Sequence, residues 1–552
     1  MTASPAADAA GELLSDLIAH GVRDLVLSPG SRSQALALAA SALHRDGTLR
    51  VHVRIDERVA GFTAVGIARE TRTPVAVVCT SGTAAGNLLP AVMEAFHSGI
   101  PLLLLTADRP PELRGIAANQ ATIQAGIFGP FVRWMHDAAV PGDGSDAGLG
   151  QRAIDAALGL TGTGIPGVAG PVQLNLPYRE PLSGDLDVHA EPGPLPAIPE
   201  PARTLIERGP RTVVIAGADA GADAEELAFA GGWPLIAEVV SGARYGRLVV
   251  HGYRALLRDP HLGGRIERAL VLGHPTLSRE VTALLSRPDV EVVAVRAGGE
   301  ALNLNGHTTA AEALTVAPGD TDRTWRGEWM TASAASAVDL SEAAPDQAGL
   351  ASDDKAARLG AVRAELDAVR RRVDRQLLVD AVWRATWPHD RLMFGSSRLV
   401  RVADQVVGGK RVPVHANRGL AGIDGTIATA TGIALASQAD GAPGVTRVLL
   451  GDLAFLHDVG ALLLPADEPA PRLQVIVGND GGGTIFDGLE VAASAPTEDL
   501  DRAFYTPQAV GLEQLAAAYG WAYSQVTTRS ALDQALTSPV TGPQLIEVPL
   551  ER

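Results

Sequence analysis

Two strand-like segments in the last third of the sequence each end in glycine followed by an acidic or amide residue. The first, VLLGDLAFLHD, places Asp452 after its apolar run, and the second, VIVGNDGGGTIF, places Asn479 and Asp480 in the same way. Carboxylate and amide oxygens are ligands that Mg²⁺ prefers and shares with phosphate groups. The glycines at 481–483 let the backbone approach a diphosphate closely. The pattern indicates a Mg²⁺ and diphosphate site, although each segment alone is equally typical of a turn or a helix cap.

A single carboxylate stands between a predicted strand and a predicted helix in the stretch RIDERVAGFTAVGIAR, residues 54–69. Glu57 follows the extended VHVRID segment and precedes an apolar helix that carries small residues. A carboxylate in such a water-poor place is suited to proton exchange near neutral pH. The alternative is a glutamate at a helix start, which the helix dipole favours by roughly 0.3 to 1 kcal/mol. Taken by itself, the stretch favours this alternative.

The elements that must position these residues alternate between strand and helix along the chain. Between residue 10 and about 182, the predicted strands are VRDLVLS, RVHVRID, PVAVVCT, PLLLLTA and PVQLNLP. The pattern continues with RTVVIAG, RALVLG and VEVVAV, and then with RLMFG, VPVHA, TRVLLGD, LQVIVGND and QLIEVP. This alternation predicts an α/β fold of doubly wound parallel sheets, in which ligands bind at the carboxyl ends of the strands.

Two segments without periodic hydrophobic residues divide the chain, which at 552 residues is too long for one hydrophobic core. The proline-rich stretch at 183–203 is typical of an extended linker. The stretch at 331–357 is rich in Ala, Ser and Asp and predicts a surface connector. We therefore expect α/β domains at residues 1–183, 204–330 and 358–552.

The composition limits the classes of partner. A net charge of -17 argues against a general nucleic-acid surface or an anionic-membrane surface, because phosphates would be repelled. The single cysteine, Cys79, lies in an apolar run, which predicts core packing. The sequence shows neither a secretory segment nor an apolar run of about twenty residues, so we expect a cytoplasmic protein without membrane insertion.

The paired segments around Asp452 and Asp480 resemble the metal signature of thiamine-diphosphate enzymes. The sequence departs from that signature with Leu453 in place of the usual glycine and Asp480 in place of the usual second asparagine. The resemblance implies thiamine diphosphate held through Mg²⁺ or Mn²⁺, with Asp452, Asp480 and the carbonyl of Gly482 as metal ligands. Asn479 is the alternative to Asp480, because the commonest family spacing counted from Asp452 ends on Asn479.

The same resemblance implies a catalytic role for Glu57. In these enzymes a glutamate after a strand of the pyrimidine-binding domain hydrogen-bonds the aminopyrimidine of the cofactor. The first predicted domain would then bind the pyrimidine and the third would bind the diphosphate and the metal, with a structural domain between them. The family also implies active sites between the first domain of one subunit and the third of another, so at least a homodimer, and often a homotetramer, is expected.

Further motifs occur in the order found in the branch of this family that serves menaquinone biosynthesis. They are SPGSRS, DERVAGF, TSGTA, DRP, ANQ, NRGLAGIDG and GGGTIF, and the middle domain carries little of the resemblance. The resemblance implies a transferase that decarboxylates 2-oxoglutarate and adds the resulting succinic semialdehyde carbanion equivalent to isochorismate. The alternatives are another thiamine-diphosphate decarboxylase or carboligase, which would act on pyruvate, and a scaffold that keeps the fold without catalysis.

The two implied substrates bring four carboxylates between them. The planar fork of arginine holds a carboxylate through two parallel charge-assisted bonds. Four arginines lie in matched motifs and are the predicted substrate-binding residues: Arg32, Arg109, Arg401 and Arg418. For each of them, a surface ion pair worth less than about 1 kcal/mol is the alternative.

The remaining site residues follow from residue-wise matching to the family. The implied substrate contacts are Ser31, Asn119, Gln120, Ile485 and Phe486, and the implied cofactor contacts are Ser396, Ser397, Ile423, Gly451, Asp452 and Gly482. In this resemblance Ile423 bends the cofactor, and Ile485 with Phe486 forms the apolar wall beside it. Core packing is the alternative for Ile423 and Ile485, because apolar residues near strand ends are usually buried.

Overall fold

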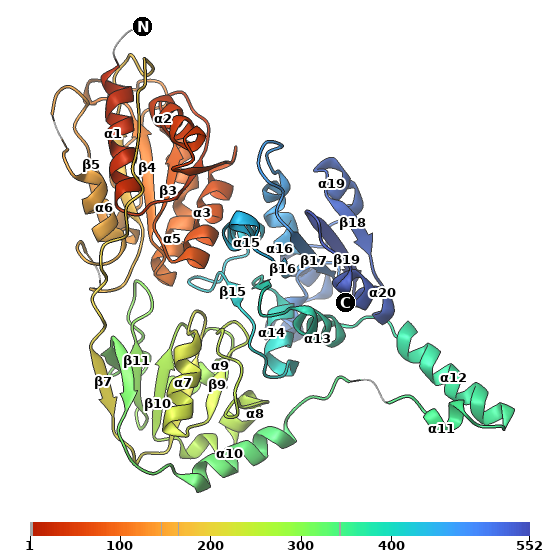
Figure 1. Cartoon of the computed structure of the whole chain (residues 1–552). Helices are drawn as coiled ribbons and strands as arrows, with labels where there is room; N and C mark the ends of the chain where they lie inside the picture. Colours follow the sequence, from red (N-terminus) through yellow and green to blue (C-terminus); the bar gives the residue numbers. More distant parts are fainter. Residues whose placement is uncertain (1–3, 145, 164, 342–343) are drawn as a thin grey trace.

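Figure 1 shows the computed structural model of the chain, in which three α/β units follow one another from the N-terminus to the C-terminus. The structure describes residues 4–144, 146–163, 165–341 and 344–552. Each unit is built on a parallel sheet, which confirms the predicted α/β fold class. In the described part of the chain, no helix combines the length and the apolar character needed to cross a membrane.

The first sheet contains the strands predicted from the N-terminal apolar runs and one further strand. Its strands are β1 (Asp24–Leu27), β2 (Arg50–Val53), β3 (Val75–Cys79), β4 (Leu102–Asp108), β5 (Trp134–Asp137) and β6 (Val172–Pro177). Its helices are α1 (Pro5–Ala19), α2 (Gln34–Arg45), α3 (Glu57–Thr71), α4 (Thr83–Asn87), α5 (Leu89–Ser98) and α6 (Leu149–Ala157). The strand order is β2-β1-β3-β4-β6-β5. The inner strands are fully buried, as in a sheet covered on both faces, and Cys79 lies in this core as predicted.

The central unit has a parallel sheet of order β12-β11-β10-β8-β9 and a separate pair, β13-β7. Its strands are β7 (Arg203–Ile206), β8 (Thr212–Ala216), β9 (Leu235–Ala237), β10 (Arg268–Leu272), β11 (Glu291–Val295), β12 (Thr309–Ala311) and β13 (Ala313–Val316). Its helices are α7 (Ala222–Gly231), α8 (Tyr253–Arg258), α9 (Arg279–Leu285) and α10 (Arg323–Ala335).

The third unit repeats the strand order of the first, as β15-β14-β16-β17-β19-β18. Its strands are β14 (Arg391–Phe394), β15 (Val414–Ala416), β16 (Thr446–Gly451), β17 (Leu473–Asn479), β18 (Ala522–Gln525) and β19 (Gln544–Pro549). Its helices are α13 (Arg375–Ala385), α14 (Arg398–Val406), α15 (Thr426–Ser437), α16 (Asp452–His457), α17 (Val491–Ser494), α18 (Thr497–Leu500), α19 (Leu512–Ala518) and α20 (Arg529–Thr537). The first and third units are therefore two copies of one topology.

The edge strands β5 and β18 are the ones that apolar runs did not reveal in the outer units. Both lie at the edge of their sheet and are partly or largely exposed, so they carry polar residues such as the WMHD and AYSQ sequences. A strand with one solvated side does not need the continuous apolar run of a central strand.

The stretch at 331–357 contains more regular structure than the predicted surface connector. Helix α10 extends through Ala335 and anchors Trp325 and Trp329 in the central core, while α11 (Gln347–Leu350) and the start of α12 (Lys355–Arg370) follow. Figure 1 shows α12 projecting away from the body of the molecule, and Ala361 is its buried residue. The part of these helices that lies within 331–357 has few large apolar residues, so a search for hydrophobic periodicity misses it.

Helices α3 and α15 join the first and third units through a close crossing, and they lie side by side in Figure 1. A Cβ atom added at Gly66 of α3 would lie 2.0 Å from the carbonyl oxygen of Thr429, and one added at Gly432 of α15 would lie 2.0 Å from that of Thr63. The small residues of the RVAGFTAVGIAR stretch therefore allow two helix backbones to touch.

Candidate active site

A cavity of about 150 Å³ lies at the carboxyl ends of β14, β16 and β17. These strands are neighbours in a parallel sheet, and Gly451 of β16 pairs with Gly478 of β17, so the loops after them meet at one edge. The cavity collects most of the predicted cofactor residues and the predicted apolar wall. Among the residues that line it are Ser396, Ser397, Ile423, Gly451, Asp452, Asp480, Gly482, Ile485 and Phe486.

Two carboxylates face this cavity. Asp452 is 6% exposed, and burial together with the nearby charge of Asp480 raises its pKa to about 6. Oδ2 of Asp480 accepts hydrogen bonds from Arg375 Nη2 at 2.8 Å and from Thr484 Oγ1 at 2.5 Å. Within the described ranges, no group of three or more His, Cys, Asp or Glu side chains gathers as a metal site.

The Asn479 side chain contacts strand β19 and does not line the cavity. Its Nδ2 donates to Glu547 Oε1 on the neighbouring strand β19 at 2.7 Å, and its Oδ1 accepts from the backbone N–H of Gly481. Asn479 and Asp480 are consecutive residues at a strand end, where successive side chains take opposite directions. Of the two alternatives, Asp480 lines the cavity.

The backbone around the cavity is shaped by glycine. Gly481 and Gly482 have φ angles of 75° and 134°, which favour glycine, and a Cβ at Gly482 would lie 2.2 Å from the carbonyl oxygen of Tyr505. Ser397 precedes α14, and its buried Oγ has no hydrogen-bond partner among the described residues. The cavity wall therefore combines a closely packed glycine backbone with a serine hydroxyl that has no hydrogen-bond partner among the described residues.

Two of the predicted substrate arginines lie beside the cavity. Arg418 is 3% exposed; its Nη1 donates to Ser396 Oγ at 3.2 Å, and its Nε and Nη2 donate to Oγ1 and the carbonyl oxygen of Thr276. Arg401 donates to the carbonyl oxygen of Ser397. Burial lowers the pKa of both guanidinium groups, and the charge of Arg401 contributes to the shift at Arg418. The hydrogen-bond acceptors of these two cations are neutral groups.

The other two arginines meet at the carboxyl ends of the first sheet. Arg32 donates to the carbonyl oxygen of Tyr178 at 3.0 Å, and Arg109 donates to Ser81 Oγ at 2.7 Å. Burial lowers the pKa of Arg32, and the charge of Arg109 lowers it further. Gln120 donates to the carbonyl oxygen of Ser81 at 2.9 Å. These side chains form one basic, polar cluster around Ser81.

Ser31 and Asn119 are exposed at the same end of the first sheet, in the loops after β1 and β4. The first-domain residues do not line the cavity of the third domain. Two groups of predicted substrate residues therefore stand on different domains of the chain.

Glu57 is the first residue of α3, and Asp56 caps this helix by accepting the backbone N–H groups of Arg58 and Val59. The Glu57 side chain is half-buried, and its Oε2 accepts from Asn87 Nδ2 at 3.4 Å. Val59 through Ala68 behind it are buried. The glutamate thus stands at the rim of an apolar helix, outside the residues that line the third-domain cavity.

Several buried carboxylates near the site were not found from the sequence. Glu94 accepts the backbone N–H groups of Gly419 and Leu420 at 3.0 Å each, and Asp458 accepts those of Ile427 and Ala428. Both support the NRGLAGIDG segment or the helix that follows it. A charged residue inside an apolar run, such as the glutamate in AVMEAF, was the signal available for Glu94.

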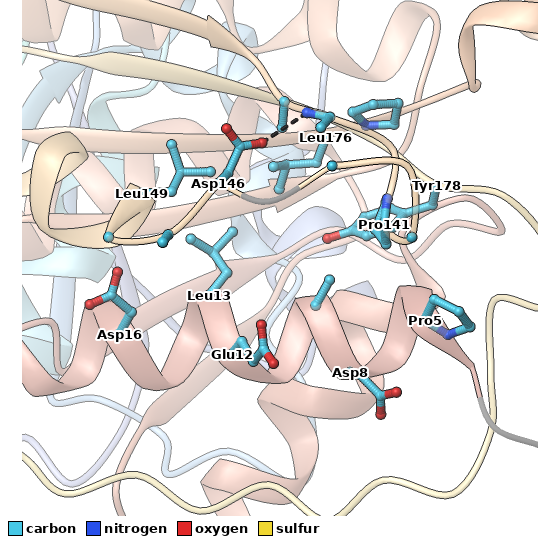
Figure 2. Close-up of a pocket in the computed structure, with 18 residues that line it drawn as sticks. Pro5, Asp8, Glu12, Leu13, Asp16, Pro141, Asp146, Leu149, Leu176 and Tyr178 are labelled. Atoms are coloured by element: carbon cyan, nitrogen blue, oxygen red, sulfur yellow. Dashed lines mark hydrogen bonds between the residues drawn. The ribbon is translucent and has the colours of Figure 1, made fainter.

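A second cavity, of about 620 Å³, lies between α1 and the loop before α6. Figure 2 shows Asp8, Glu12 and Asp16 of α1 along one side of it. The predicted site residues do not line it, and its acidic side would repel carboxylate substrates. The cavity of the third domain is therefore the candidate active site.

Comparison with known proteins agrees with this geometry. The family model described as the N-terminal TPP binding domain of thiamine pyrophosphate enzymes matches residues 8–127. The crystal structure of benzoylformate decarboxylase from Polynucleobacter necessarius resembles the fold with a TM-score of 0.66, at 16% sequence identity over 100% of this chain and 99% of that one. The fold and the site together define a thiamine-diphosphate enzyme.

Relatives named 2-succinyl-5-enolpyruvyl-6-hydroxy-3-cyclohexene-1-carboxylate synthase match the whole chain. The one from Leifsonia xyli subsp. xyli is 54% identical and the one from Clavibacter michiganensis subsp. michiganensis is 50% identical, each over 100% of this chain and 97% of the relative. The one from Paenarthrobacter aurescens is 42% identical over 97% of this chain and 92% of the relative. This chain belongs to the family of 2-succinyl-5-enolpyruvyl-6-hydroxy-3-cyclohexene-1-carboxylate synthases, thiamine-diphosphate-dependent transferases of menaquinone biosynthesis.

Proposed function

We propose that the enzyme decarboxylates 2-oxoglutarate and adds the resulting four-carbon unit to isochorismate, with release of CO₂. The observation that carries this proposal concerns the four predicted substrate arginines: they are buried or half-buried, and their hydrogen-bond acceptors are neutral. The four are Arg32, Arg109, Arg401 and Arg418. Buried guanidinium groups with neutral partners retain the charge needed to hold substrate carboxylates.

The third-domain cavity fits a diphosphate held through a divalent cation. Burial and the nearby charge of Asp480 raise the pKa of Asp452, and a cation bound between the two carboxylates would stabilise their ionised forms. The proposed ligands are these two carboxylates and the carbonyl of Gly482, with Mg²⁺ or Mn²⁺ as the ion. The hydrogen bonds that Asp480 accepts from Arg375 Nε, Arg375 Nη2 and Thr484 Oγ1 all go to Oδ2, which leaves Oδ1 for the cation. Asn479, by contrast, is hydrogen-bonded to Glu547.

When bound, thiamine diphosphate supplies a nucleophilic carbon and an electron sink for the decarboxylation. We assign Glu57 the task of exchanging a proton between its carboxylate and the aminopyrimidine ring nitrogen. The apolar segment from Val59 to Ala68 supports this role, because it keeps water from one side of the carboxylate. Ser396, Ser397 and Gly451 would hold the diphosphate, and Ile423 would support the bent cofactor.

The active site in this proposal lies between two subunits. The third-domain cavity, at about 150 Å³, is smaller than the roughly 300 to 1,000 Å³ of pockets that enclose a whole small ligand. Glu57 is half-buried within the single chain, so a second subunit can cover it. We therefore propose at least a homodimer, with the first domain of one subunit facing the third domain of another. The proposed location is the cytoplasm.

The test is consumption of 2-oxoglutarate by the purified enzyme with thiamine diphosphate and Mg²⁺, with and without isochorismate. The expected result is adduct formation that requires isochorismate and a loss of at least about a hundredfold in kcat for Glu57→Gln, because that variant cannot exchange the proton. Glu12→Gln, the same change on the exposed face of α1, is the matched control and should keep wild-type activity.

Each other outcome has a definite meaning. Turnover of pyruvate in place of 2-oxoglutarate would overturn the substrate assignment and favour another carboligase. Wild-type kcat in Glu57→Gln would remove the catalytic role of that residue. Failure of the wild type to bind the cofactor would overturn the assignment of the diphosphate site.

A further inference from the structure

A loop of the central domain reaches the candidate active site. This loop, residues 273–278, connects β10 to α9, and its Thr276 reaches the guanidinium group of Arg418 in the third domain. Thr276 offers two acceptors to the same group: Oγ1 accepts from Nε at 2.8 Å and the carbonyl oxygen accepts from Nη2 at 3.1 Å. Two acceptors from one residue fix the plane of a guanidinium group as well as its position.

Arg418 uses three of its N–H donors in hydrogen bonds with the described residues. A guanidinium group carries five N–H donors, of which Thr276 takes one on Nε and one on Nη2, and Ser396 takes one on Nη1. One N–H on each terminal nitrogen is then left, and a carboxylate can accept hydrogen bonds from such groups. Ser396 lines the cavity, so the oriented group stands next to the proposed reaction site.

A buried glutamate holds the loop that carries Thr276. Glu238 follows β9 and is 0% exposed. Its carboxylate accepts the backbone N–H of Thr276 with both oxygens at 3.0 Å and that of Leu277 at 2.7 Å. Burial and the charge of Asp404 raise its pKa to about 7, so keeping a carboxylate here is costly. The hydrogen bonds of this carboxylate go to the loop backbone. Because the carboxylate is costly to bury, we infer that its function is to hold the loop in place.

The same region is fixed to the third domain. Asp404 of α14 accepts the backbone N–H of Val239, next to Glu238, at 2.9 Å, and it also accepts from Tyr253 Oη and Arg254 Nη2. The end of β9 is therefore attached to the domain that carries Arg418. The distance between loop 273–278 and the active site is set by these contacts.

We propose that Thr276 and Glu238 are positioning residues for Arg418, through which the central domain sets the affinity for a carboxylate substrate. This inference rests on the proposed role of Arg418 in binding substrate. It gives the central domain a part in substrate binding, in addition to its structural role.

The experiment measures KM and kcat for both substrates in Arg418→Ala, Thr276→Val, Thr276→Ser and Glu238→Gln. Arg418→Ala identifies the substrate whose KM depends on this arginine. Thr276→Val keeps the shape of the side chain but removes the hydroxyl that accepts from the charged Arg418 Nε. The KM for the substrate that Arg418 binds should therefore rise about tenfold, while kcat changes less than about twofold. Thr276→Ser restores the hydroxyl and should restore KM. Glu238→Gln retains one accepting oxygen and should raise the same KM.

The controls separate positioning from folding. Thr315→Val makes the same change on β13 and should leave both constants unchanged.

A fall in kcat at constant KM, in proportion to a loss of folded protein measured by thermal melting, would mean that these residues have only a structural role and would overturn the proposal. If Arg418→Ala raises KM but neither Thr276→Val nor Glu238→Gln does, the positioning role is wrong and the substrate role of Arg418 stands. If Arg418→Ala changes neither KM, the substrate role falls and the inference falls with it.

Discussion

At the scale of single residues, two groups of carboxylates near the site differ in what they contact. Asp452 and Asp480 line a cavity, and Asp452 also accepts the backbone N–H of Leu453. Glu94, Glu238 and Asp458 instead accept N–H groups from distant segments of the backbone. A carboxylate that accepts N–H groups from a distant loop helps to fix that loop, and one that faces a cavity can contact a ligand.

The choice between Asp480 and Asn479 as metal ligand is tested by substitution. Asp480→Ala should weaken Mn²⁺ binding in the presence of thiamine diphosphate by at least about tenfold, because it removes a charged oxygen ligand. Asn479→Ala should have a smaller effect, since Asn479 contacts Glu547. Electron paramagnetic resonance of free Mn²⁺ measures both affinities. A larger loss in the Asn479 variant would reverse the assignment.

At the scale of elements, the crossing of α3 and α15 connects the helix that begins at Glu57 with the helix that follows the NRGLAGIDG segment. Ten of the fifteen residues of α3 and nine of the twelve residues of α15 are buried. Any change in their separation therefore moves residues of both predicted half-sites.

Gly66→Ala tests this contact. The added methyl would lie 2.0 Å from the carbonyl oxygen of Thr429, so the helices must separate, and overpacking of this kind costs about 1 to 3 kcal/mol. The melting temperature should fall by several degrees and activity should fall with it. Gly86→Ala in α4 is the matched control: its Cβ would meet nothing within 4 Å, and alanine favours helix. Equal melting temperatures for the two variants would contradict the close crossing.

At the scale of the whole molecule, ion pairs join the domains. Glu70 of the first domain pairs with Arg391 at 2.6 Å and with His415 at 3.2 Å in the third, and Arg69 pairs with Asp219 of the central domain at 2.6 Å. Burial alone would raise the pKa of Glu70, but the contacts with His415 and Arg391 outweigh it and lower the pKa to about 2. The ionised glutamate therefore stabilises the domain arrangement.

Glu70→Gln should lower the melting temperature at pH 7, because breaking a partly buried ion pair costs about 3 kcal/mol. The pKa of Glu70 is below its ordinary value of 4.5, so its contribution is complete above about pH 5 and is lost as pH falls from 4.5 toward 2. The difference in melting temperature between wild type and variant should shrink below pH 4.5. Glu226→Gln, an exposed change on α7, should show no such difference. A difference that grows on acidification would contradict the stated sign.

Much of the fold could be predicted from the sequence, because apolar runs mark the central strands of parallel sheets directly. The edge strands β5 and β18 and the helices within 331–357 could not, because exposed elements need no such runs. The domain boundaries and the roles of the site residues stay predictions.

The sequence by itself determined the family and the candidate residues, because each motif is a short segment whose chemistry is local in the chain. Only the tertiary structure decided which of two consecutive residues, Asn479 or Asp480, faces the cavity, since neighbouring side chains at a strand end point in opposite directions. The tertiary structure also decided that Arg418 contacts Thr276, 142 positions away in the sequence. It likewise decided that Glu94 accepts the backbone N–H groups of the two residues after Arg418. Such contacts depend on how the domains pack, which no local pattern encodes.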